Sequence, residues 1–269
     1  MFLLIFLLLI KNLYSYDQNM AIHFTKLSQT SYCVRSVNQW SCPTCENTIQ
    51  LDYIVENNGA LALQGYDYTT NSMFVSFRGS SNLENWIDDI QISHISPYND
   101  KNIKVSKGFY TAYSYIKGSI FQNLAEMSEK YNTKQVEVTG HSLGAAEATL
   151  MIYDLFYLYP QYHITHFYTF GSPRVGNTYF VNATAQFSAE QYRITHYYDI
   201  VPHLPEEVLD YIHLPNEIWY SEKNNNFRIC EDSVNKEDTK CSDSCAPVSC
   251  ISTSDHINYL NITMGSAGC

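Results

Sequence analysis

Positive charge is scarce in this sequence, and no cluster of lysine or arginine stands out. The chain of 269 residues has 16 lysines and arginines against 27 aspartates and glutamates, a formal net charge of −11. A nucleic-acid partner is disfavoured, because phosphate binding needs a basic patch. The acidic surplus also disfavours electrostatic adhesion to anionic lipid, so we expect apolar surface to carry any contact with a membrane or droplet.

Long apolar runs, low-complexity tracts and internal repeats are also missing. The apolar run from Phe2 to Ile10 is far shorter than the roughly 20 residues that a transmembrane helix needs, so no transmembrane segment is predicted. We interpret residues 1–15 as a secretory signal peptide cleaved near Ser15, with a short buried helix as the alternative. Without any sign of a second domain, residues 16–269 are expected to form a single α/β domain.

The eight cysteines are an even number, which agrees with export to an oxidising compartment where all of them can pair. Cys42-Pro-Thr-Cys45 has the spacing of a redox pair or of half a zinc site. Redox use is disfavoured because the motif does not join a strand to a helix, and zinc would need reduced thiolates outside the cell. We predict no metal and no cofactor. Asn182 and Asn261 begin Asn-X-Thr tripeptides, which are glycosylation acceptors in a secreted chain.

Apolar periodicity indicates strands that alternate with helices. Strands are predicted at 51–55, 60–68, 73–77, 136–138, 166–170 and 193–197. Helical spacing predicts helices at 20–33, 107–131 and 143–159, the last of which is stopped by Pro160. This order implies a largely parallel sheet, whose ligands collect at the carboxyl ends of the strands.

The pentapeptide Gly140-His141-Ser142-Leu143-Gly144 joins a predicted strand to a predicted helix. Gly-X-Ser-X-Gly in this context is a nucleophile elbow. A side chain at Gly140 or Gly144 would collide with neighbouring backbone where the tight turn projects the Ser142 hydroxyl out of the sheet. We therefore predict Ser142 as a catalytic nucleophile. A helix N-cap serine with incidental glycines is the alternative.

A serine nucleophile needs a histidine to accept its proton and a carboxylate to hold the histidine tautomer. In α/β hydrolases the order is serine, acid, histidine, so both partners should follow Ser142. His256 lies in a late loop beyond the last predicted strand, and we predict it as the base. The competing histidines are His163, His166, His196, His203 and His213. His166 and His196 fall in strand patterns that favour a satisfied core histidine, and His163 and His166 are too isolated from other ligand types to suggest a metal.

Asp199 is the predicted acid, because it follows the strand at 193–197 and so lies at a carboxyl end. Asp154 falls inside a predicted helix and Asp210 in a polar stretch, so both are expected to be solvated. An acyl-transfer site also needs donors for the oxyanion. The Leu143 amide and the turn at Ser80 are the candidates, and losing one such donor typically costs about 3 kcal/mol of transition-state stabilisation.

A short helix with an apolar face is predicted just after Ser80. Its apolar residues recur at helical spacing: Leu83, Trp86, Ile87 and Ile90. Ser81 and Glu84 fit a capping box at its start. The position beside the oxyanion turn favours a lid that opens against a lipid surface, and an ordinary surface helix packed on the core is the alternative.

Several segments together resemble the class 3 lipases, typified by filamentous-fungal triacylglycerol lipases, with the related feruloyl esterases. The segments are FVSFRGSSNLENWIDDI, VTGHSLGAAEATL, YTFGSPRVGN, YYDIVPHLP and DHINYL, in the family's order and approximate spacing. The resemblance covers most of the mature chain. It implies an α/β-hydrolase fold, with a central mostly parallel sheet flanked by helices, a short helical lid and stapling disulfides.

The same resemblance implies a triad of Ser142, Asp199 and His256 and supports the oxyanion and lid assignments. It also implies that Val201 and Leu204 line an acyl groove. Two disulfides are implied, from Cys33 to Cys269 and from Cys42 to Cys45. The other four cysteines exceed the family's usual number, and their pairing stays open: Cys230, Cys241, Cys245 and Cys250. The segment 220–250 is interpreted as an elaborated loop near the base.

We therefore expect a secreted serine ester hydrolase that acts on acylglycerols at a lipid–water interface. Phospholipase A1 and feruloyl esterase activities are alternatives, although Trp86 favours lipid over phenolic esters. A catalytically silent, secreted lipid-binding protein is the non-enzymatic alternative. Silent relatives usually lose a triad member, whereas this sequence supplies all three.

Overall fold

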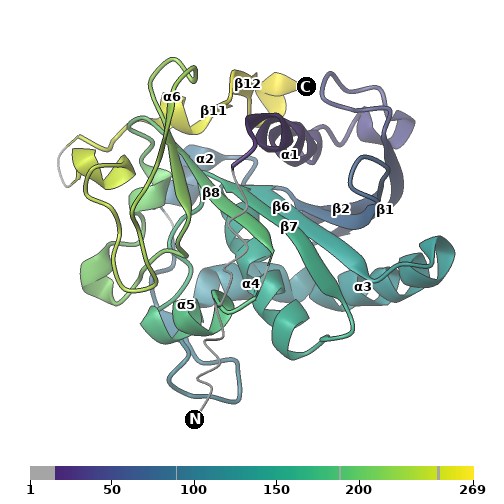
Figure 1. The fold of residues 1–269 in the computed structure, drawn as a ribbon, viewed down its shortest axis with the longest axis horizontal. Helices are drawn as coiled ribbons and strands as arrows, with labels where there is room; N and C mark the ends of the chain where they lie inside the picture. Colours follow the sequence, from purple (N-terminus) through teal and green to yellow (C-terminus); the bar gives the residue numbers. More distant parts are fainter. Residues whose placement is uncertain (1–15, 89, 188, 247–248) are drawn as a thin grey trace, which may run out of the picture.

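An eight-stranded sheet organises the fold, as Figure 1 shows. The computed structural model describes residues 16–88, 90–187, 189–246 and 249–269, so the predicted signal peptide at 1–15 lies outside the described residues. The strand order is β1-β2-β3-β6-β7-β8-β9-β10. The neighbours from β3 to β9 pair in parallel, and the outer pairs β1/β2, β2/β3 and β9/β10 are antiparallel. The predicted mostly parallel sheet is thus confirmed.

The elements have the following bounds. The main sheet contains β1 (Ile49–Asn57), β2 (Ala60–Asp67), β3 (Ser72–Phe77), β6 (Gln135–His141), β7 (His163–Phe170), β8 (Glu190–His196), β9 (Glu217–Tyr220) and β10 (Phe227–Ile229). Two small sheets pair β4 (His94–Ile95) with β5 (Val105–Ser106), and β11 (Asn258–Tyr259) with β12 (Ile262–Thr263). The α-helices are α1 (Gln18–Thr30), α2 (Leu83–Asp88), α3 (Lys107–Tyr131), α4 (Leu143–Tyr157), α5 (Thr178–Thr184) and α6 (Thr253–His256). Short 3-10 turns lie at Val37–Gln39, Val201–His203, Glu207–Leu209, Ser242–Cys245 and Ser266–Gly268.

Two apolar layers form on the two faces of the sheet, because successive strand residues point to opposite sides. Leu61 and Leu63 of β2 belong to the cluster that includes α1. Ala62, between them, belongs to the cluster that includes α3 and α4. Figure 1 shows α1 on one side of the sheet and α3 and α4 on the other. The sheet is therefore covered on both faces, as parallel sheets require.

The segment at 220–250, interpreted from the sequence as an elaborated loop, also contains a strand. It starts at the end of β9, which pairs with β8, and it contains β10, which pairs with β9. These strands are only four and three residues long. Strand β9 is stabilised by pairing with β8 and β10 by pairing with β9, so no local apolar pattern reveals them.

Asp154 is another correction, because it is buried rather than solvated. Its carboxylate is 0% exposed and accepts hydrogen bonds from the Tyr113 hydroxyl at 3.0 Å and the Lys117 ammonium at 3.1 Å. Helix α4 packs against both the sheet and α3 and is buried from Gly144 to Leu155, and α3 supplies the partners that a buried carboxylate needs. Asp210, by contrast, is exposed as predicted.

Four disulfides staple the chain. They join Cys33 to Cys269, Cys42 to Cys45, Cys230 to Cys241, and Cys245 to Cys250. The first links the end of the chain to the loop after α1, and Figure 1 shows the C-terminus close to α1. The last two supply the pairing that the sequence left open. They constrain the segment that leads to His256.

Buried ion pairs hold the same segment against the sheet. Arg174 binds Glu237 in a bidentate pair, with Nε–Oε1 and Nη2–Oε2 distances of 2.7 and 2.8 Å. Arg193 of β8 lies 3.2 Å from Glu217 of β9 and 3.5 Å from Asp232. Paired guanidinium groups are the usual partners of carboxylates at such depth. The segment that leads to His256 is therefore anchored from several sides.

Candidate active site

Ser142 lies at the turn between β6 and α4. Its backbone has φ 61° and ψ −131°, in the left-handed half of conformational space that non-glycine residues rarely occupy. A Cβ at Gly140 would lie 2.3 Å from the Gly144 carbonyl oxygen, and a Cβ at Gly144 would lie 2.3 Å from that of Phe77. Both glycines are therefore required by close backbone approach, as the sequence predicted.

Asp199 and His256 form a buried, hydrogen-bonded pair. His256 Nδ1 lies 2.8 Å from Asp199 Oδ2 and 3.0 Å from Oδ1. The carboxylate also accepts the Val201 N–H at 2.8 Å and the Tyr259 hydroxyl at 2.5 Å. With these donors in place the carboxylate cannot rotate freely, so it fixes the orientation of the imidazole.

Shared backbone contacts bring His256 close to Ser142. The Ser142 N–H donates to the Phe170 carbonyl oxygen at 3.0 Å. At the next residue, Gly171, a Cβ would lie 2.8 Å from His256 Cε1, so the imidazole packs directly on this backbone. Ser142 Oγ and His256 Nε2 are both buried and have no hydrogen-bond partner among the described residues. Because Nδ1 faces Asp199, Nε2 is the nitrogen that remains for a reacting group.

His141 also supports the base, a role that the sequence analysis missed. Its Nε2 lies 2.8 Å from the His256 carbonyl oxygen, and its Nδ1 lies 2.7 Å from the Tyr32 hydroxyl. Burial and the neighbouring His256 lower the pKa of His141 well below its usual value, so the ring is neutral. A neutral ring can donate from Nε2 to the carbonyl and accept the Tyr32 proton at Nδ1. Its place inside the pentapeptide was the only local signal.

Leu143 and the turn that contains Ser80, the two predicted sources of oxyanion donors, both lie next to Ser142. Leu143 is the first residue of α4, where N–H groups have no acceptor within the helix. The turn at 79–80 lies against the serine, because a Cβ at Gly79 would be 3.0 Å from Ser142 Cβ. The Ser80 hydroxyl is held by the backbone of Asn82, to whose carbonyl oxygen it donates at 2.9 Å.

The predicted helix after Ser80 is α2. Leu83, Trp86 and Ile87 are all partly buried, and the Trp86 ring lies near-parallel to Phe109 of α3 with centroids 6.1 Å apart. The capping prediction is wrong by one residue, because the Asn85 N–H donates to the Asn82 side chain at 3.2 Å. The Ser80 hydroxyl closes a turn onto Asn82, so the helix starts after Asn82 rather than after Ser81.

The residues predicted for an acyl groove directly follow Asp199. Val201 is fully buried and Leu204 is partly buried. A 3-10 turn at Val201–His203 leads from one to the other, and the N–H of Val201 donates to the Asp199 carboxylate. The groove candidates and the acid are therefore positioned by one short segment.

Of the competing histidines, His196 and His213 are buried and hydrogen bond to backbone carbonyl oxygens, and His163 is exposed. Burial lowers the pKa of His203 to about 4. His166 differs from the prediction, because it is not isolated from other ligand types. Its Nδ1 lies 3.6 Å from Glu137 and its Nε2 lies 4.0 Å from Glu190. Strand pairing brings these carboxylates to it from distant parts of the chain.

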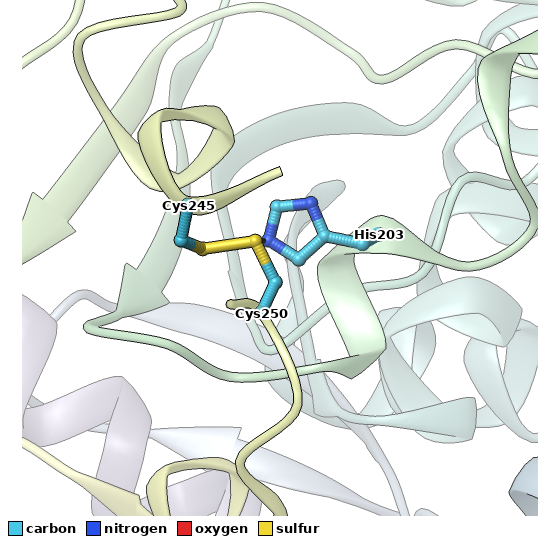
Figure 2. Close-up of side chains that lie close together, drawn as sticks. All are labelled: His203, Cys245 and Cys250. Atoms are coloured by element: carbon cyan, nitrogen blue, oxygen red, sulfur yellow. Dashed lines mark hydrogen bonds between the residues drawn. A yellow bond between two sulfur atoms is a disulfide. The ribbon is translucent and has the colours of Figure 1, made fainter. Parts of the chain in front are cut away.

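Three groups of potential metal ligands lie close together among the described residues. Figure 2 shows the first, in which His203 Nε2 lies 3.9 Å from Sγ of Cys245 in the disulfide with Cys250. The second places Glu217 beside the disulfide of Cys230 and Cys241. Thiolates bind metals and disulfide sulfurs do not, so neither group is a metal site while its disulfide is intact. The third group is His23, Asp67 and Glu137.

The two predicted glycosylation acceptors are both exposed. Asn182 lies in α5, and Asn261 lies in the tight turn between β11 and β12 with φ 63°. Their modification stays a prediction. In the part of the chain that the structure describes, no helix combines the length and apolarity that crossing a bilayer demands.

Known proteins are similar to this chain in sequence and in fold. The family model described as "Lipase (class 3)" matches residues 74–209. A lipase of Rhizomucor miehei is 30% identical over 262 residues, which cover 93% of this chain and 70% of that lipase. Secreted mono- and diacylglycerol lipase A of Penicillium cyclopium is 32% identical over 200 residues, covering 71% of this chain and 63% of that protein. A solved triacylglycerol lipase, whose catalytic centre is described as a serine protease triad, superposes with a TM-score of 0.84 at 29% identity, covering 93% of this chain and 97% of that chain.

Proposed function

Because the chain belongs to the class 3 lipases of the α/β-hydrolase superfamily and is a carboxylic ester hydrolase, we propose that it cleaves acylglycerols with Ser142, Asp199 and His256. One observation carries the assignment of these residues. Asp199 holds His256 at Nδ1, while His256 Nε2 and Ser142 Oγ are both buried and have no hydrogen-bond partner among the described residues. A hydroxyl and a base nitrogen held in this way are prepared for proton transfer.

The proposed reaction has two halves. Ser142 Oγ attacks the ester carbonyl carbon while His256 Nε2 takes the hydroxyl proton, and the protonated histidine then gives that proton to the leaving alkoxide of the glycerol. In the second half, water attacks the acyl-enzyme, His256 takes a water proton, and the fatty acid leaves as Ser142 recovers its hydrogen. Asp199 keeps its negative charge throughout and stabilises the imidazolium.

The oxyanion that forms in each half needs donors in fixed positions. We assign this role to the Leu143 amide at the start of α4 and to Ser80 in the adjacent turn. The positive end of the α4 dipole lies at the same place and favours negative charge there. No cofactor or metal takes part in this proposed chemistry.

Helix α2 is proposed as a lid. Ser142 is only 2% exposed and His256 only 1%, so a long acyl chain cannot reach them without movement of a covering segment. Movement of α2 would expose apolar side chains of Leu83, Trp86 and Ile87 together with the groove at Val201 and Leu204. Because the net charge of −11 opposes attraction to anionic lipid, this apolar surface would hold the enzyme at an interface.

A secretory location is proposed for the same enzyme. The Penicillium relative is named as secreted. The four disulfides of this chain fit an oxidising compartment, in which they persist.

The substrate proposal is tested by initial rates on three esters: a long-chain triacylglycerol emulsion, a phosphatidylcholine dispersion and methyl ferulate. We expect hydrolysis of the emulsion, with a steep rise in rate above the solubility limit of the lipid, because a lid opens at an interface. Cleavage of phosphatidylcholine alone or of methyl ferulate alone would contradict the acylglycerol assignment and move the substrate to a phospholipid or a phenolic ester.

Gly171 offers a test of how tightly the base must be placed. In Gly171→Ala the new methyl group would lie 2.8 Å from His256 Cε1 and 2.9 Å from Nδ1, which displaces the imidazole from Asp199. We expect the turnover number to fall about 100-fold, as misplacement of a catalytic group by about 1 Å typically does. The measurement is kcat on a soluble short-chain ester, for which the lid is not limiting.

Gly265→Ala is the matched control for that variant. Gly265 has a similarly positive φ of 86°, but a Cβ there would meet nothing within 4 Å. Both substitutions strain the backbone by roughly 1 kcal/mol, so both should lower the melting temperature slightly. Equal activity of the two variants would contradict the role given to Gly171.

A further inference from the structure

A polar cluster lies under α1, far along the strands from Ser142. Glu137 is near the start of β6, and His166, its registered partner, is on β7. Asp67 ends β2, which runs antiparallel to β3. The cluster is therefore at the amino ends of the parallel strands, whereas Ser142 follows the carboxyl end of β6.

The alternation of side chains along the strands directs all three groups to the same face. On β6, Val136 and Val138 pack on the side of α3 and α4, so Glu137 points to α1. On β7, His166 lies on the same face of the strand as Tyr168 and Phe170, which belong to the cluster around α1. On β2, Asp67 lies on the same face as Leu61 and Leu63, which belong to the same cluster. Helix α1 adds His23 from above, and its neighbour Phe24 packs on His166 with ring centroids 5.6 Å apart.

Ligand atoms of His23, Asp67 and Glu137 all lie within 4.8 Å of one another. His23 Nε2 is 2.5 Å from Asp67 Oδ2. Glu137 is fully buried, and its Oε1 has no hydrogen-bond partner among the described residues. His166 is partly exposed, but its Nδ1, 3.6 Å from Glu137 Oε2, is a buried atom with no hydrogen-bond partner among the described residues. An unpartnered carboxylate oxygen at this depth is costly, and a cation is the group that most directly satisfies it.

We propose that His23 Nε2, Asp67, Glu137 and His166 Nδ1 form a structural site for one zinc ion. Two imidazole nitrogens and two carboxylates are a donor set that zinc takes in tetrahedral geometry. Zinc would displace the proton that His23 Nε2 shares with Asp67, and two carboxylates with two neutral imidazoles then balance a divalent ion in a buried place. The third group of potential ligands differs from the other two in that it contains no disulfide sulfur.

The atoms of these residues that face away from the site have partners of their own. His23 Nδ1 lies 2.5 Å from Glu46 Oε2, and Lys26 holds the other oxygen of Glu46 at 2.7 Å. The Thr69 N–H donates to Asp67 Oδ1 at 2.7 Å, and the Thr70 hydroxyl donates to Glu137 Oε2 at 2.7 Å. A carboxylate on the far nitrogen of a histidine is the usual outer partner of a zinc ligand, because it fixes the tautomer that leaves the other nitrogen free.

The spacing of the ligand atoms is close to what zinc needs. Zinc–nitrogen and zinc–oxygen bonds of about 2.1 Å in a tetrahedron put neighbouring ligand atoms about 3.4 Å apart. His166 Nδ1 lies 3.6 Å from Oε2 of the carboxylate whose Oε1 has no partner among the described residues, and the 2.5 Å between His23 and Asp67 would open by about 1 Å. Such a site would join α1, β2, β6 and β7. Its expected role is to stabilise the fold, and it does not depend on the proposed esterase chemistry.

The test uses the full secreted chain under non-reducing conditions. After removal of metal with a chelator, zinc is titrated by calorimetry and the metal content is measured by mass spectrometry. We expect one zinc per chain and a melting temperature several degrees higher with zinc than with chelator, because an ion that binds only the folded state stabilises it. Absence of stoichiometric zinc, or tighter binding of calcium than of zinc, would overturn the proposal and leave a hydrogen-bonded cluster only.

Variants locate the ion. Glu137→Gln keeps the size of the side chain and removes one anionic ligand, so we expect zinc affinity to fall at least 100-fold. His166→Gln, at the partly exposed edge of the cluster, gives the same test if the first variant does not fold. His163→Gln changes an exposed histidine on the same strand, and His203→Gln changes the histidine beside a disulfide; both should bind zinc like the parent. Full zinc binding in both Glu137→Gln and His166→Gln, or its loss in His203→Gln, would refute the site.

Discussion

Replacing Ser142 by alanine is expected to abolish ester hydrolysis and to leave the fold intact. The hydroxyl is the nucleophile of the first half of the proposed reaction, without which no acyl-enzyme forms, and removal of a triad serine lowers turnover by at least about 10⁴-fold in serine hydrolases. Alanine is tolerated sterically, because it only removes an oxygen that has no hydrogen-bond partner among the described residues. The measurement is the initial rate on a triacylglycerol emulsion, with circular dichroism to verify the fold.

A control serine and a covalent label make this result specific. Ser114 is exposed on α3 and its hydroxyl donates to the local Thr111 carbonyl oxygen, so Ser114→Ala should keep the parent rate. A lipid-like phosphonate should label the parent and Ser114→Ala but not Ser142→Ala. Hydrolysis that survives in Ser142→Ala would refute the nucleophile. A parent chain that takes no label and cleaves no ester would instead be a silent lipid-binding protein.

The nucleophile could be predicted from the sequence because its geometry is local. Five consecutive residues specify the turn, and the apolar patterns on either side specify the strand and the helix. Asp199 and His256 needed one more rule, the chain order of the partners together with the position of Asp199 after a strand. Both rules work without knowledge of which strands are neighbours.

The groups that hold the triad in place could not be predicted in that way. Tyr32 reaches His141 across 109 residues, and Tyr259 reaches Asp199 across 60. Neither tyrosine differs in its local pattern from the many others in a chain with 23 tyrosines. The zinc-site candidates are missed for the same reason, because His166 looks isolated until strand pairing places it beside Glu137.

Edge strands and buried carboxylates show the same limit. Strands β9 and β10 are short, and pairing of β9 with β8 and of β10 with β9, rather than their own pattern, makes them strands. Asp154 was expected in solvent because it is a charged residue in a helix, yet α3 supplies both of its partners. Tertiary packing decides these cases, and it overrides the local preference.

Replacing Asp199 by asparagine is expected to lower kcat about 10⁴-fold with little change in the fold. The carboxylate accepts from His256 Nδ1, which leaves Nε2 unprotonated and able to take the Ser142 proton. An amide can present its NH₂ group to Nδ1, which stabilises the opposite tautomer with the proton on Nε2. The base is then lost although every side chain keeps its place. The measurement is kcat and KM on a soluble short-chain ester, where we expect kcat to fall and KM to stay nearly constant.

Two further variants separate the tautomer argument from a merely structural one. Tyr259→Phe removes a hydroxyl that donates to Asp199 but leaves the Val201 amide and the negative charge, so a loss of only a few-fold is expected. Asp210→Asn changes the exposed carboxylate that competed for the role of acid, and it should match the parent. If Asp199→Asn and Tyr259→Phe lost the same amount of activity, the carboxylate would serve only as a packing group. A much larger loss in Asp199→Asn than in Tyr259→Phe means that the charge itself sets the tautomer of His256 and stabilises the imidazolium.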